Sequence, residues 1–558
     1  MKSKIIIYQV LPRIFGNTNS SCIPNSSYKE NGSGKLEDFS VEVLNEIKEL
    51  GVSHIWFTGV IRHATKTSFE EFGIKANHPH IVKGEAGSPY SITDYYDISP
   101  ELSVDVNSRL KEFQNLVKRV HSCGLKVLID FVPNHLSREY KSLQKPSKVR
   151  DFGEDDKSDY SFHPMNNFYY IQNQTFISPI ANSLSESEKL LSPYTETPAK
   201  VTGNNCITAT PSKDDWFETI KLNYGVDLFN SNKKHFNPIP NTWIKMREVL
   251  FYWLEMGVDG FRCDMVGMVP QEFWQWVIRE VKQKFNDSLF IGELYEKEKY
   301  NSFLNFCKFD LLYDKVGLYD TLKGVVRRER SATEISYCWQ SLDGIENQML
   351  NFLENHDEVR VASPFFANDP LKAFPALTVS LMLNNAPFML YFGQELGEEG
   401  MNSEGYSGID GRTSIFDYCS IKSIREWLLG NKDNKIRELY RRVLTIATQE
   451  EAIYNGSRYD IQYANGYSHS YNPDRHYSFV RKCSDSLIIV IANFGEPLAT
   501  ISLNMPKEMF NYFNLSNHNS YMAENLLTGE KTTLKLSFKE KISIKIEKEG
   551  VAIVKLLL

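Results

Sequence analysis

The segments VNSRLKEFQNLVKRVHSCG, residues 106–124, and KVLIDFV, residues 126–132, form the unit on which the fold depends. The first has apolar residues at helical spacing and ends at a glycine, a common stop for an amphipathic helix. The second is rich in β-branched and apolar residues, which is typical of a buried strand. A helix that leads directly into such a strand indicates an α/β domain with a parallel sheet.

The same alternation of strands and helices continues through about the first 450 residues. Nearly every predicted strand is followed by a predicted helix, and a long helical stretch, roughly 423–450, closes the series. Eight parallel β/α units predict a closed (β/α)8 TIM barrel. The predicted strands are KIIIYQVL (4–11), HIWFTGV (54–60), KVLIDFV (126–132), VDGFRCDMV (258–266), SLFIGEL (288–294), FDLLYD (309–314), MLNFLEN (349–355) and PFMLYFGQE (387–395).

Two regions interrupt this pattern. Residues 136–238 follow the third strand and are rich in Asn, Ser, Asp and Pro, with little helical periodicity. A structureless loop of that length is implausible in a compact domain, so we expect a small inserted domain. Residues 455–558 contain short alternating strands and predict a C-terminal all-β sandwich domain. The barrel is therefore assigned to residues 1–135 and 239–454.

Composition excludes several classes of partner. The chain has 558 residues, 42% of them hydrophobic and 24% charged, with a net charge of −7, which is an ordinary globular profile. This slight acidity gives no electrostatic footprint for nucleic acid or an anionic membrane. The apolar runs are also shorter than the 18 residues that a membrane span needs. From the charge and from these runs, we expect neither a nucleic-acid nor a membrane partner.

The cysteines and the N-terminus bear on the cellular compartment. The eight cysteines lie far apart and form no CxxC motif, which favours thiols in a reducing compartment over a disulfide framework or a zinc site. The N-terminal MKSKIIIYQVLPRIF resembles a first strand more than a signal peptide. We therefore expect a cytoplasmic protein, with export as the alternative.

Four predicted strands end in polar motifs: DFVPNH (130–135), GFRCDMV (260–266), IGELY (291–295) and LENHDE (353–358). In barrels of this kind the chemistry lies at the C-terminal ends of the strands. Arg262 and Asp264 share one strand face, so the arginine favours an ionised carboxylate, as a nucleophile requires. Glu293 ends an otherwise uncharged strand, and desolvation is expected to raise its pKa toward that of a general acid.

Two carboxylates with different pKa values that flank one bond are what glycoside hydrolysis requires. At about 5–5.5 Å apart they act with retention, through a covalent glycosyl-enzyme. Asp357 supplies a third acid that can stabilise positive charge on the sugar. Each acid alone has a structural alternative as a helix cap or an ion-pair partner, and we expect Asp130 to brace Arg262 or the adjoining loop. Four such strand ends in this order favour the catalytic interpretation.

These motifs resemble the signature regions of the α-amylase family, glycoside hydrolase family 13, and the likeness covers the barrel, the insertion and the C-terminal β domain. The resemblance implies that Asp264 is the nucleophile and Glu293 the acid/base, while Asp357 grips sugar hydroxyls and favours the transition state. In the motif ENHDE, residues 354–358, the flanking glutamates are interpreted as structural or rim charges. The resemblance further implies that the glucose of subsite −1 is held by Arg262, His135, His356 and, through stacking, Tyr90.

The sequence departs from the family pattern in two places. Many members have a Lys-His pair after the nucleophile, and here the corresponding stretch is MVGMV, residues 265–269. Asn134 matches a calcium ligand of many relatives, and acids such as GEDD, residues 153–156, could complete a site for Ca²⁺. The alternative is that this acidic loop is merely solvated. No organic cofactor is expected.

We therefore expect a retaining hydrolase of α-1,4 bonds in maltooligosaccharides or starch-like glucans, of the α-amylase or neopullulanase-like type. One rival is a transglycosylase or an isomerising enzyme for small α-glucosides, which would share every catalytic residue. The other is a non-catalytic glucan-binding protein, which is disfavoured because all three carboxylates are present. The motifs set neither the oligomeric state nor the choice between endo and exo action.

Overall fold

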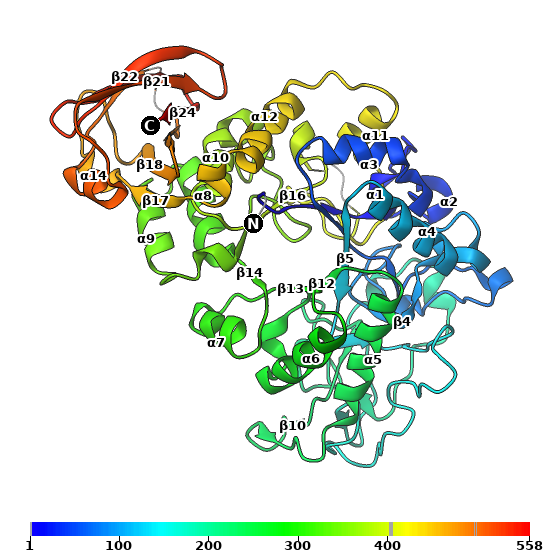
Figure 1. Cartoon of the computed structure of the whole chain (residues 1–558). Helices are drawn as coiled ribbons and strands as arrows, with labels where there is room; N and C mark the ends of the chain where they lie inside the picture. Colours follow the sequence, from blue (N-terminus) through cyan, green and yellow to red (C-terminus); the bar gives the residue numbers. More distant parts are fainter. Residues whose placement is uncertain (1–2, 401–404, 496, 498) are drawn as a thin grey trace.

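The structure, a computed structural model, confirms the predicted (β/α)8 barrel (Figure 1). It describes residues 3–400, 405–495, 497 and 499–558. Each predicted strand supplies one strand of the barrel, and all neighbours pair in parallel. The barrel strands are β1 (Ile6–Val10), β2 (His54–Phe57), β5 (Lys126–Phe131), β12 (Gly260–Cys263), β13 (Leu289–Gly292), β14 (Leu311–Tyr313), β15 (Met349–Phe352) and β16 (Phe388–Tyr391).

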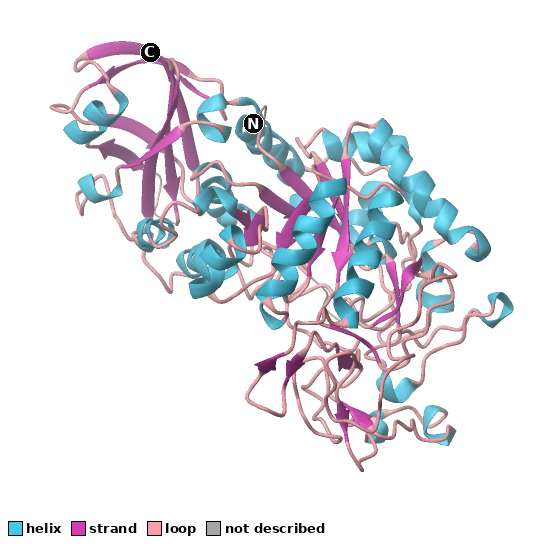
Figure 2. Cartoon of the chain, turned by 60° about the horizontal axis from the view of Figure 1, so that its bottom comes forward, coloured by secondary structure: helices cyan, strands magenta, loops and turns pink. Residues whose placement is uncertain are grey.

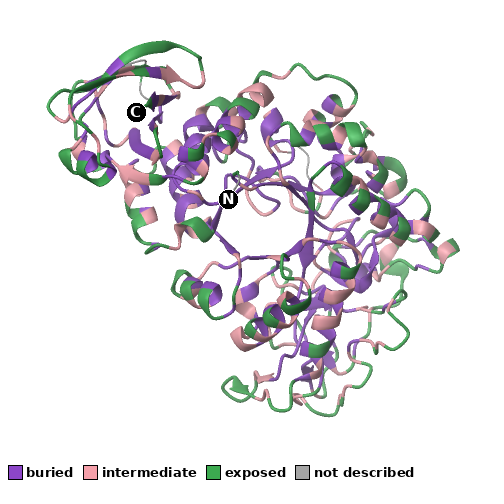
Figure 3. Ribbon diagram, in the orientation of Figure 1, coloured by how far each residue is buried: buried purple, intermediate pink, exposed green. Residues whose placement is uncertain are grey.

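Helices surround the barrel and bury their apolar faces against the strands, which form the buried centre of the molecule (Figure 3). The main helices are α3 (Val41–Lys48), α4 (Arg109–Ser122), α5 (Asn241–Glu255), α6 (Gln271–Lys284), α7 (Tyr300–Asn305), α8 (Asp320–Val326) and α10 (Phe374–Met382). Among the described residues, none of these helices combines the length and the apolar character needed to cross a membrane.

The helical stretch predicted at 423–450 is two helices rather than one. They are α11 (Lys422–Leu428) and α12 (Lys435–Gln449). Gly430 between them has a φ of 102°, a conformation that glycine adopts readily and that stops a helix. Asn434 then caps α12 by accepting hydrogen bonds from the N–H groups of Ile436 and Arg437.

The chain between β5 and α5 consists mostly of loops that share their own apolar core (Figure 2). Its strands form three short antiparallel pairs: β6 (His135–Ser137) with β9 (Thr219–Lys221), β7 (Tyr170–Ile171) with β8 (Ala199–Lys200), and β10 (Val226–Asp227) with β11 (Lys233–Lys234). The core contains Tyr169, Phe176, Val201 and Phe217. β6 and β9 bring this region back to the C-terminal end of β5, where the predicted site lies.

The C-terminal region forms two antiparallel sheets, as the predicted β domain requires. The larger sheet has the order β17 (Ser457–Asp460), β18 (His476–Cys483), β19 (Ser486–Asn493), β24 (Val551–Leu557), β21 (Asn519–Asn525) and β22 (Lys531–Leu536). The smaller sheet pairs β20 (Ala499–Leu503) with β23 (Ile542–Ile546).

The larger sheet is buried on both faces near β19. Ile488 and Val490 join the core shared with the barrel, whereas Leu487 and Ile489 belong to the core of the C-terminal domain. This division follows from the alternation of side chains along a strand. α10, whose residues are all buried, packs against β19 and β15. The C-terminal domain is therefore anchored on the barrel through a continuous apolar interface.

Arg481 on β18 reinforces this anchor. It is 1% exposed and donates hydrogen bonds to the carbonyl groups of Leu383 (3.0 Å), Ala452 (3.0 Å) and Gly456 (2.8 Å). These carbonyls come from the chain before β16 and from the connection into the C-terminal domain. One side chain thus satisfies buried acceptors from both parts of the molecule.

The first prediction concerns this anchor. Arg481→Met is expected to lower the melting temperature by several degrees, because each buried carbonyl left without a donor costs about 1–3 kcal/mol. Thermal unfolding by circular dichroism measures the change. Lys535→Met is the matched control, since Lys535 lies on β22 with a 46% exposed side chain. An unchanged melting temperature for Arg481→Met would contradict the assignment.

Candidate active site

The register of two neighbouring strands places Asp264 and Glu293 side by side. Cys263 of β12 pairs with Gly292 of β13, and each acid is the next residue along its strand. The N–H of Glu293 donates to the carbonyl of Cys263 at 3.0 Å, which holds this alignment beyond the strand ends. Both side chains are buried, at 6% and 4% exposure. The two carboxylates therefore lie at the same level at the C-terminal end of the barrel.

Arg262 connects the acids at the centre of the site. Its Nη1 lies 2.7 Å from Asp264 Oδ1, and its Nη2 lies 2.8 Å from Glu293 Oε1. Three aromatic rings surround the guanidinium group within 5.6 Å, those of Trp56, Tyr90 and Tyr313. The residue is 1% exposed and lies behind the acids rather than on the cavity wall. This placement suits a group that orients the acids.

Asp130 also contacts this cluster, which confirms that it is a bracing residue. Its Oδ1 lies 3.7 Å from Arg262 Nη1, and its Oδ2 accepts the N–H of Gly59 at 3.2 Å. Burial raises the pKa of Asp130 to about 7, against the opposing charge of Arg262.

Glu293 has the environment of a proton donor. Burial raises its pKa, as predicted, and the charge of Asp264 raises it further, while Arg262 opposes both effects. Tyr295 donates its hydroxyl to Glu293 Oε1 at 2.7 Å, and the N–H of Met265 donates to Oε2 at 2.9 Å. Met265 has a φ of 43°, an unusual conformation for a non-glycine residue, in the turn that directs this N–H at the acid.

The pKa of Asp264 does not follow the expectation that Arg262 decides whether this carboxyl group is ionised. The charge and the hydrogen bond of Arg262 do lower the pKa of Asp264, but burial raises it more. The charge of Asp357 raises the pKa of Asp264 as well, so burial and a neighbouring acid together oppose Arg262.

Asp357 and His356 follow β15 and face the same space. His356 Nε2 lies 3.1 Å from Asp357 Oδ2. Although solvent reaches 41% of the Asp357 side chain through the mouth of the pocket, the surrounding protein and the charge of Glu293 raise its pKa. Burial lowers the pKa of His356 to about 3, so its ring is neutral at physiological pH.

Tyr90 and His135 complete the predicted group. The Tyr90 hydroxyl lies 2.5 Å from His356 Nε2, and the two rings stack with centroids 5.3 Å apart. His135 lies 5.1 Å from the ring of Trp216, and burial lowers its pKa to about 3. The structure thus brings together the side chains predicted from four separate motifs and from the segment before β4 (Ile92–Ile98).

Six of the predicted side chains line a cavity of about 250 Å³ above the barrel: Tyr90, His135, Asp264, Glu293, His356 and Asp357. Its walls come from segments that the sequence motifs did not indicate: Lys83, Trp216, Glu218, Ile415 and Phe416. Lys83 Nζ lies 3.0 Å from Glu218 Oε2, and the N–H of Ala86 donates to the carbonyl of Phe416 at 2.9 Å. These contacts tie the loop before β4 to the inserted region and to the loop before α11.

Sequence reasoning missed three further residues of the site. Besides Tyr295, they are Tyr313, whose hydroxyl accepts from Arg262 Nε at 3.2 Å, and Gln9, whose Nε2 lies 2.7 Å from His356 Nδ1. Tyr295 lies two residues after Glu293, on the same side of an extended chain, and this spacing could have indicated it. Gln9 and Tyr313 lie on barrel strands without a motif.

The flanking acids of ENHDE are structural, as predicted. Glu354 is 1% exposed, lies 2.9 Å from Arg360 Nη1 and accepts the N–H of Val361. Glu358 lies 3.3 Å from Lys315 Nζ.

The surroundings of Asn134 do not fit a calcium ion. Its Oδ1, the expected ligand atom, accepts a hydrogen bond from the Lys221 amino group, which also donates to the Met268 carbonyl at 3.0 Å. Burial lowers the pKa of Lys221 to about 7, so below neutral pH the group is an ammonium that would repel a cation. Asp156, from the acidic loop, accepts the N–H groups of Asn167 and Phe168 instead. Within the described part of the chain, no cluster of three or more His, Cys, Asp or Glu residues could hold a metal ion.

Comparisons with known proteins agree with this geometry. A family model described as "Alpha amylase, catalytic domain" matches residues 9–442, from β1 into α12. Alpha-amylase 2 of Dictyoglomus thermophilum is 21% identical over 89% of this chain and 71% of its own length. Alpha-amylase 3 of the same organism is 25% identical over 57% of this chain, and the match spans 55% of that relative.

A solved structure shows the same fold over almost the whole chain. It is a noncanonic maltogenic alpha-amylase from Thermotoga neapolitana, which is 18% identical and superposes with a TM-score of 0.63. The superposition covers 99% of both chains, so it includes the C-terminal sheets as well as the barrel.

The second prediction tests the contact between Lys221 and Asn134. Lys221→Met is expected to lower the melting temperature by a few degrees, because it leaves the buried Asn134 Oδ1 without a donor. Lys234→Met is the control, since the Lys234 side chain is 57% exposed and its amino group pairs with Glu272 at the surface. A calcium chelator is expected to leave the melting temperature of the unmodified protein unchanged. A rise in melting temperature on addition of Ca²⁺ would contradict this account.

Proposed function

The chain belongs to the alpha-amylase family, and we propose that it is a retaining glycoside hydrolase that cleaves α-1,4-glucosidic bonds in maltooligosaccharides or starch-like glucans. The observation that carries the proposal is the bridge that Arg262 makes between Asp264 and Glu293, at 2.7 and 2.8 Å. An inverting pair needs carboxyl groups about 6.5–9.5 Å apart, with room for a water molecule. Because one guanidinium group contacts both acids, the two carboxyl groups lie close together, and this closeness supports retention.

In the first step, the Asp264 carboxylate attacks the anomeric carbon of the sugar in the cavity. The bond from that carbon to the glycosidic oxygen breaks, and Glu293 gives its proton to the leaving oxygen. Arg262 holds both acids in position. Its positive charge offsets the negative charge that Glu293 acquires when its proton leaves. The products are a glycosyl ester on Asp264 and a free sugar end.

In the second step, Glu293 acts as a base. Its carboxylate takes a proton from water, the water oxygen attacks the anomeric carbon, and the ester bond to Asp264 breaks. The hydrogen bonds from Tyr295 and Met265 stabilise the ionised Glu293 that this step requires. Both acids return to their starting protonation states, so the proton balance of the cycle closes.

The remaining side chains support a sugar bound beside the acids. His135, neutral at physiological pH, can form a hydrogen bond with a sugar hydroxyl. His356, also neutral, can do so where a sugar hydroxyl replaces the Tyr90 hydroxyl at its Nε2. Asp357 at the mouth of the cavity can accept bonds from two vicinal hydroxyls, and the ring of Tyr90 offers an apolar face to the sugar. The cavity, at about 250 Å³, lies below the usual range for drug-sized ligands, which favours one tightly held glucosyl unit.

The third prediction tests the proposed nucleophile. Asp264→Asn is expected to lower turnover of maltoheptaose by several orders of magnitude, because an amide is a poor nucleophile. The matched control is Asp130→Asn, an acid near the same arginine that the mechanism does not use as a reactant. It is expected to retain more activity than Asp264→Asn. Chromatography of products over time gives both rates.

The same time course distinguishes the rival functions. Shorter products alone support hydrolysis, with early internal fragments for endo action and single glucose release for exo action. Products longer than seven units would replace hydrolysis with transfer. Binding of maltoheptaose without turnover by the unmodified protein would refute an enzymatic function.

The fourth prediction concerns pH. Glu293 must be protonated for the first step, so that step slows as pH rises through its pKa. The Tyr295 hydrogen bond favours the ionised form and lowers this pKa. Tyr295→Phe is therefore expected to move the alkaline limb of kcat/KM to higher pH by about one unit, the shift expected for a hydrogen bond to a charged group.

Tyr300→Phe is the matched control for the pH profile. Tyr300 is buried, and its hydroxyl has no hydrogen-bond partner in the part of the chain that the structure describes. Removal of that hydroxyl is expected to leave the alkaline limb in place. A shift of the limb to lower pH in Tyr295→Phe would exclude Glu293 as the acid that sets it.

A further inference from the structure

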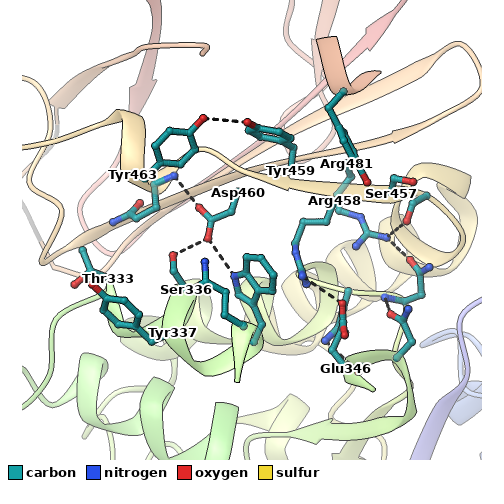
Figure 4. Close-up of a pocket in the computed structure, with 18 of the residues that line it drawn as sticks. Thr333, Ser336, Tyr337, Glu346, Ser457, Arg458, Tyr459, Asp460, Tyr463 and Arg481 are labelled. Atoms are coloured by element: carbon teal, nitrogen blue, oxygen red, sulfur yellow. Dashed lines mark hydrogen bonds and ion pairs between the residues drawn. The ribbon is translucent and has the colours of Figure 1, made fainter. Parts of the chain in front are cut away.

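A second, larger cavity of about 750 Å³ lies between the barrel and the C-terminal domain (Figure 4). Its walls come from α9 (Glu334–Gln340), η11 (Glu346–Gln348), the residues before β16, the strand β17 and α14 (Lys507–Phe513). η11 and Asn385 precede β15 and β16, whereas the proposed catalytic acids follow their strands. This cavity therefore opens at the end of the barrel opposite the candidate active site.

The base of this cavity is rigid. The Asp460 carboxylate accepts a hydrogen bond from Ser336 at 2.6 Å (Figure 4). It also accepts from Trp339 (3.1 Å) and Tyr477 (2.9 Å), and together these bonds join α9 to the larger sheet. The Arg458 guanidinium lies 3.7 Å from the centre of the Trp339 ring. The hydrogen-bonding groups of Asp460, Ser336 and Trp339 therefore already have partners, and we assign them a structural role at the base of the cavity.

Tyrosine rings stand exposed around this base. Tyr337 is 69% exposed, Tyr463 is 67% exposed and Tyr512 is 58% exposed. The hydroxyl groups of Tyr459 and Tyr463 lie 3.0 Å apart, and the ring of Tyr459 lies 5.5 Å from that of Tyr512. These contacts restrict the rings of Tyr459, Tyr463 and Tyr512 before any ligand binds, which lowers the entropic cost of binding. A group of exposed aromatic rings around a cavity is typical of a binding surface.

The polar groups of the cavity suit a neutral ligand with many hydroxyls. Two arginines and two acids line it, so their formal charges cancel. Arg458 lies 3.4 Å from Glu346, which leaves this arginine partly neutralised toward an anionic ligand. The amide side chains of Gln340, Asn347 and Asn455 lie at exposed positions on the wall and offer both donors and acceptors. The second oxygen of Glu346, Oε2, is buried without a hydrogen-bond partner in the described structure.

We propose that this cavity is a second carbohydrate-binding site, which holds an α-glucan chain away from the catalytic centre. Sugar rings have apolar faces that stack on tyrosine and hydroxyl edges that pair with amide groups, and the cavity presents both. The choice of an α-glucan as the ligand rests on the proposed function. Because the cavity faces away from the acids, its role is to retain a polymer rather than to extend the catalytic cleft.

Retention in a native gel that contains glycogen tests this site. The experiment uses the full chain with Asp264→Asn, so that glycogen is not degraded during the run. Tyr463→Ala in this background is expected to weaken retention at least about fivefold. Tyr467→Ala is the matched control, because Tyr467 lies in the same domain, is 73% exposed and is not part of the cavity. Turnover of maltotriose by the Tyr463→Ala chain with Asp264 intact is expected to stay unchanged.

Two outcomes would overturn the proposal: equal retention of the Tyr463→Ala and Tyr467→Ala proteins, or no retention of the starting protein by glycogen. Loss of maltotriose turnover in Tyr463→Ala would also contradict it, because the cavity would then act on the catalytic centre. Failure of the proposed function gives a different result. In that case the unmodified chain would not turn over maltotriose, while the retention assay would still compare the two tyrosine variants.

Discussion

The interaction on which the site depends is the buried pairing of Arg262 with Asp264 and Glu293. A guanidinium group that is 1% exposed needs close negative partners, since an unpaired buried charge costs several kcal/mol. The carboxylates need the cation equally, because their own burial raises both pKa values. The parallel register of β12 and β13 supplies this mutual pairing without any adjustment of the loops. A structural requirement for charge balance therefore fixes the geometry that the proposed chemistry uses.

The charge cluster is rigid because a complete barrel surrounds it, whereas the walls of the cavity are assembled from less regular chain. The ion pair of Lys83 with Glu218 and the bond from Ala86 to Phe416 hold three loops together over the acids. Loops positioned by a rigid scaffold are where substrate selectivity usually resides. In the proposed function, the acids set the reaction class and these walls set which sugars reach them.

The C-terminal domain contributes through a different kind of contact. Its larger sheet shares an apolar core with the barrel through Ile488 and Val490, and Arg481 satisfies carbonyls of both parts. The same interface leaves the second cavity open beside it, with Asp460 and Trp339 at its base. A junction that is apolar in one place and polar with exposed tyrosines in another is consistent with both anchoring and ligand binding.

The sequence by itself determined the eight strands, their order in the barrel and the acids at their ends. Strand and helix periods are local patterns, and parallel strands of a barrel bring their carboxyl ends to one face. GFRCDMV and IGELY could therefore be placed together from the sequence alone. Only the tertiary structure showed that burial outweighs Arg262 at Asp264, and that Lys221 takes the oxygen of Asn134 that calcium was expected to bind. The residues that form the walls of the active-site cavity could not be predicted from the sequence either. These features depend on contacts between residues remote in the chain, which loop packing decides and no local period encodes.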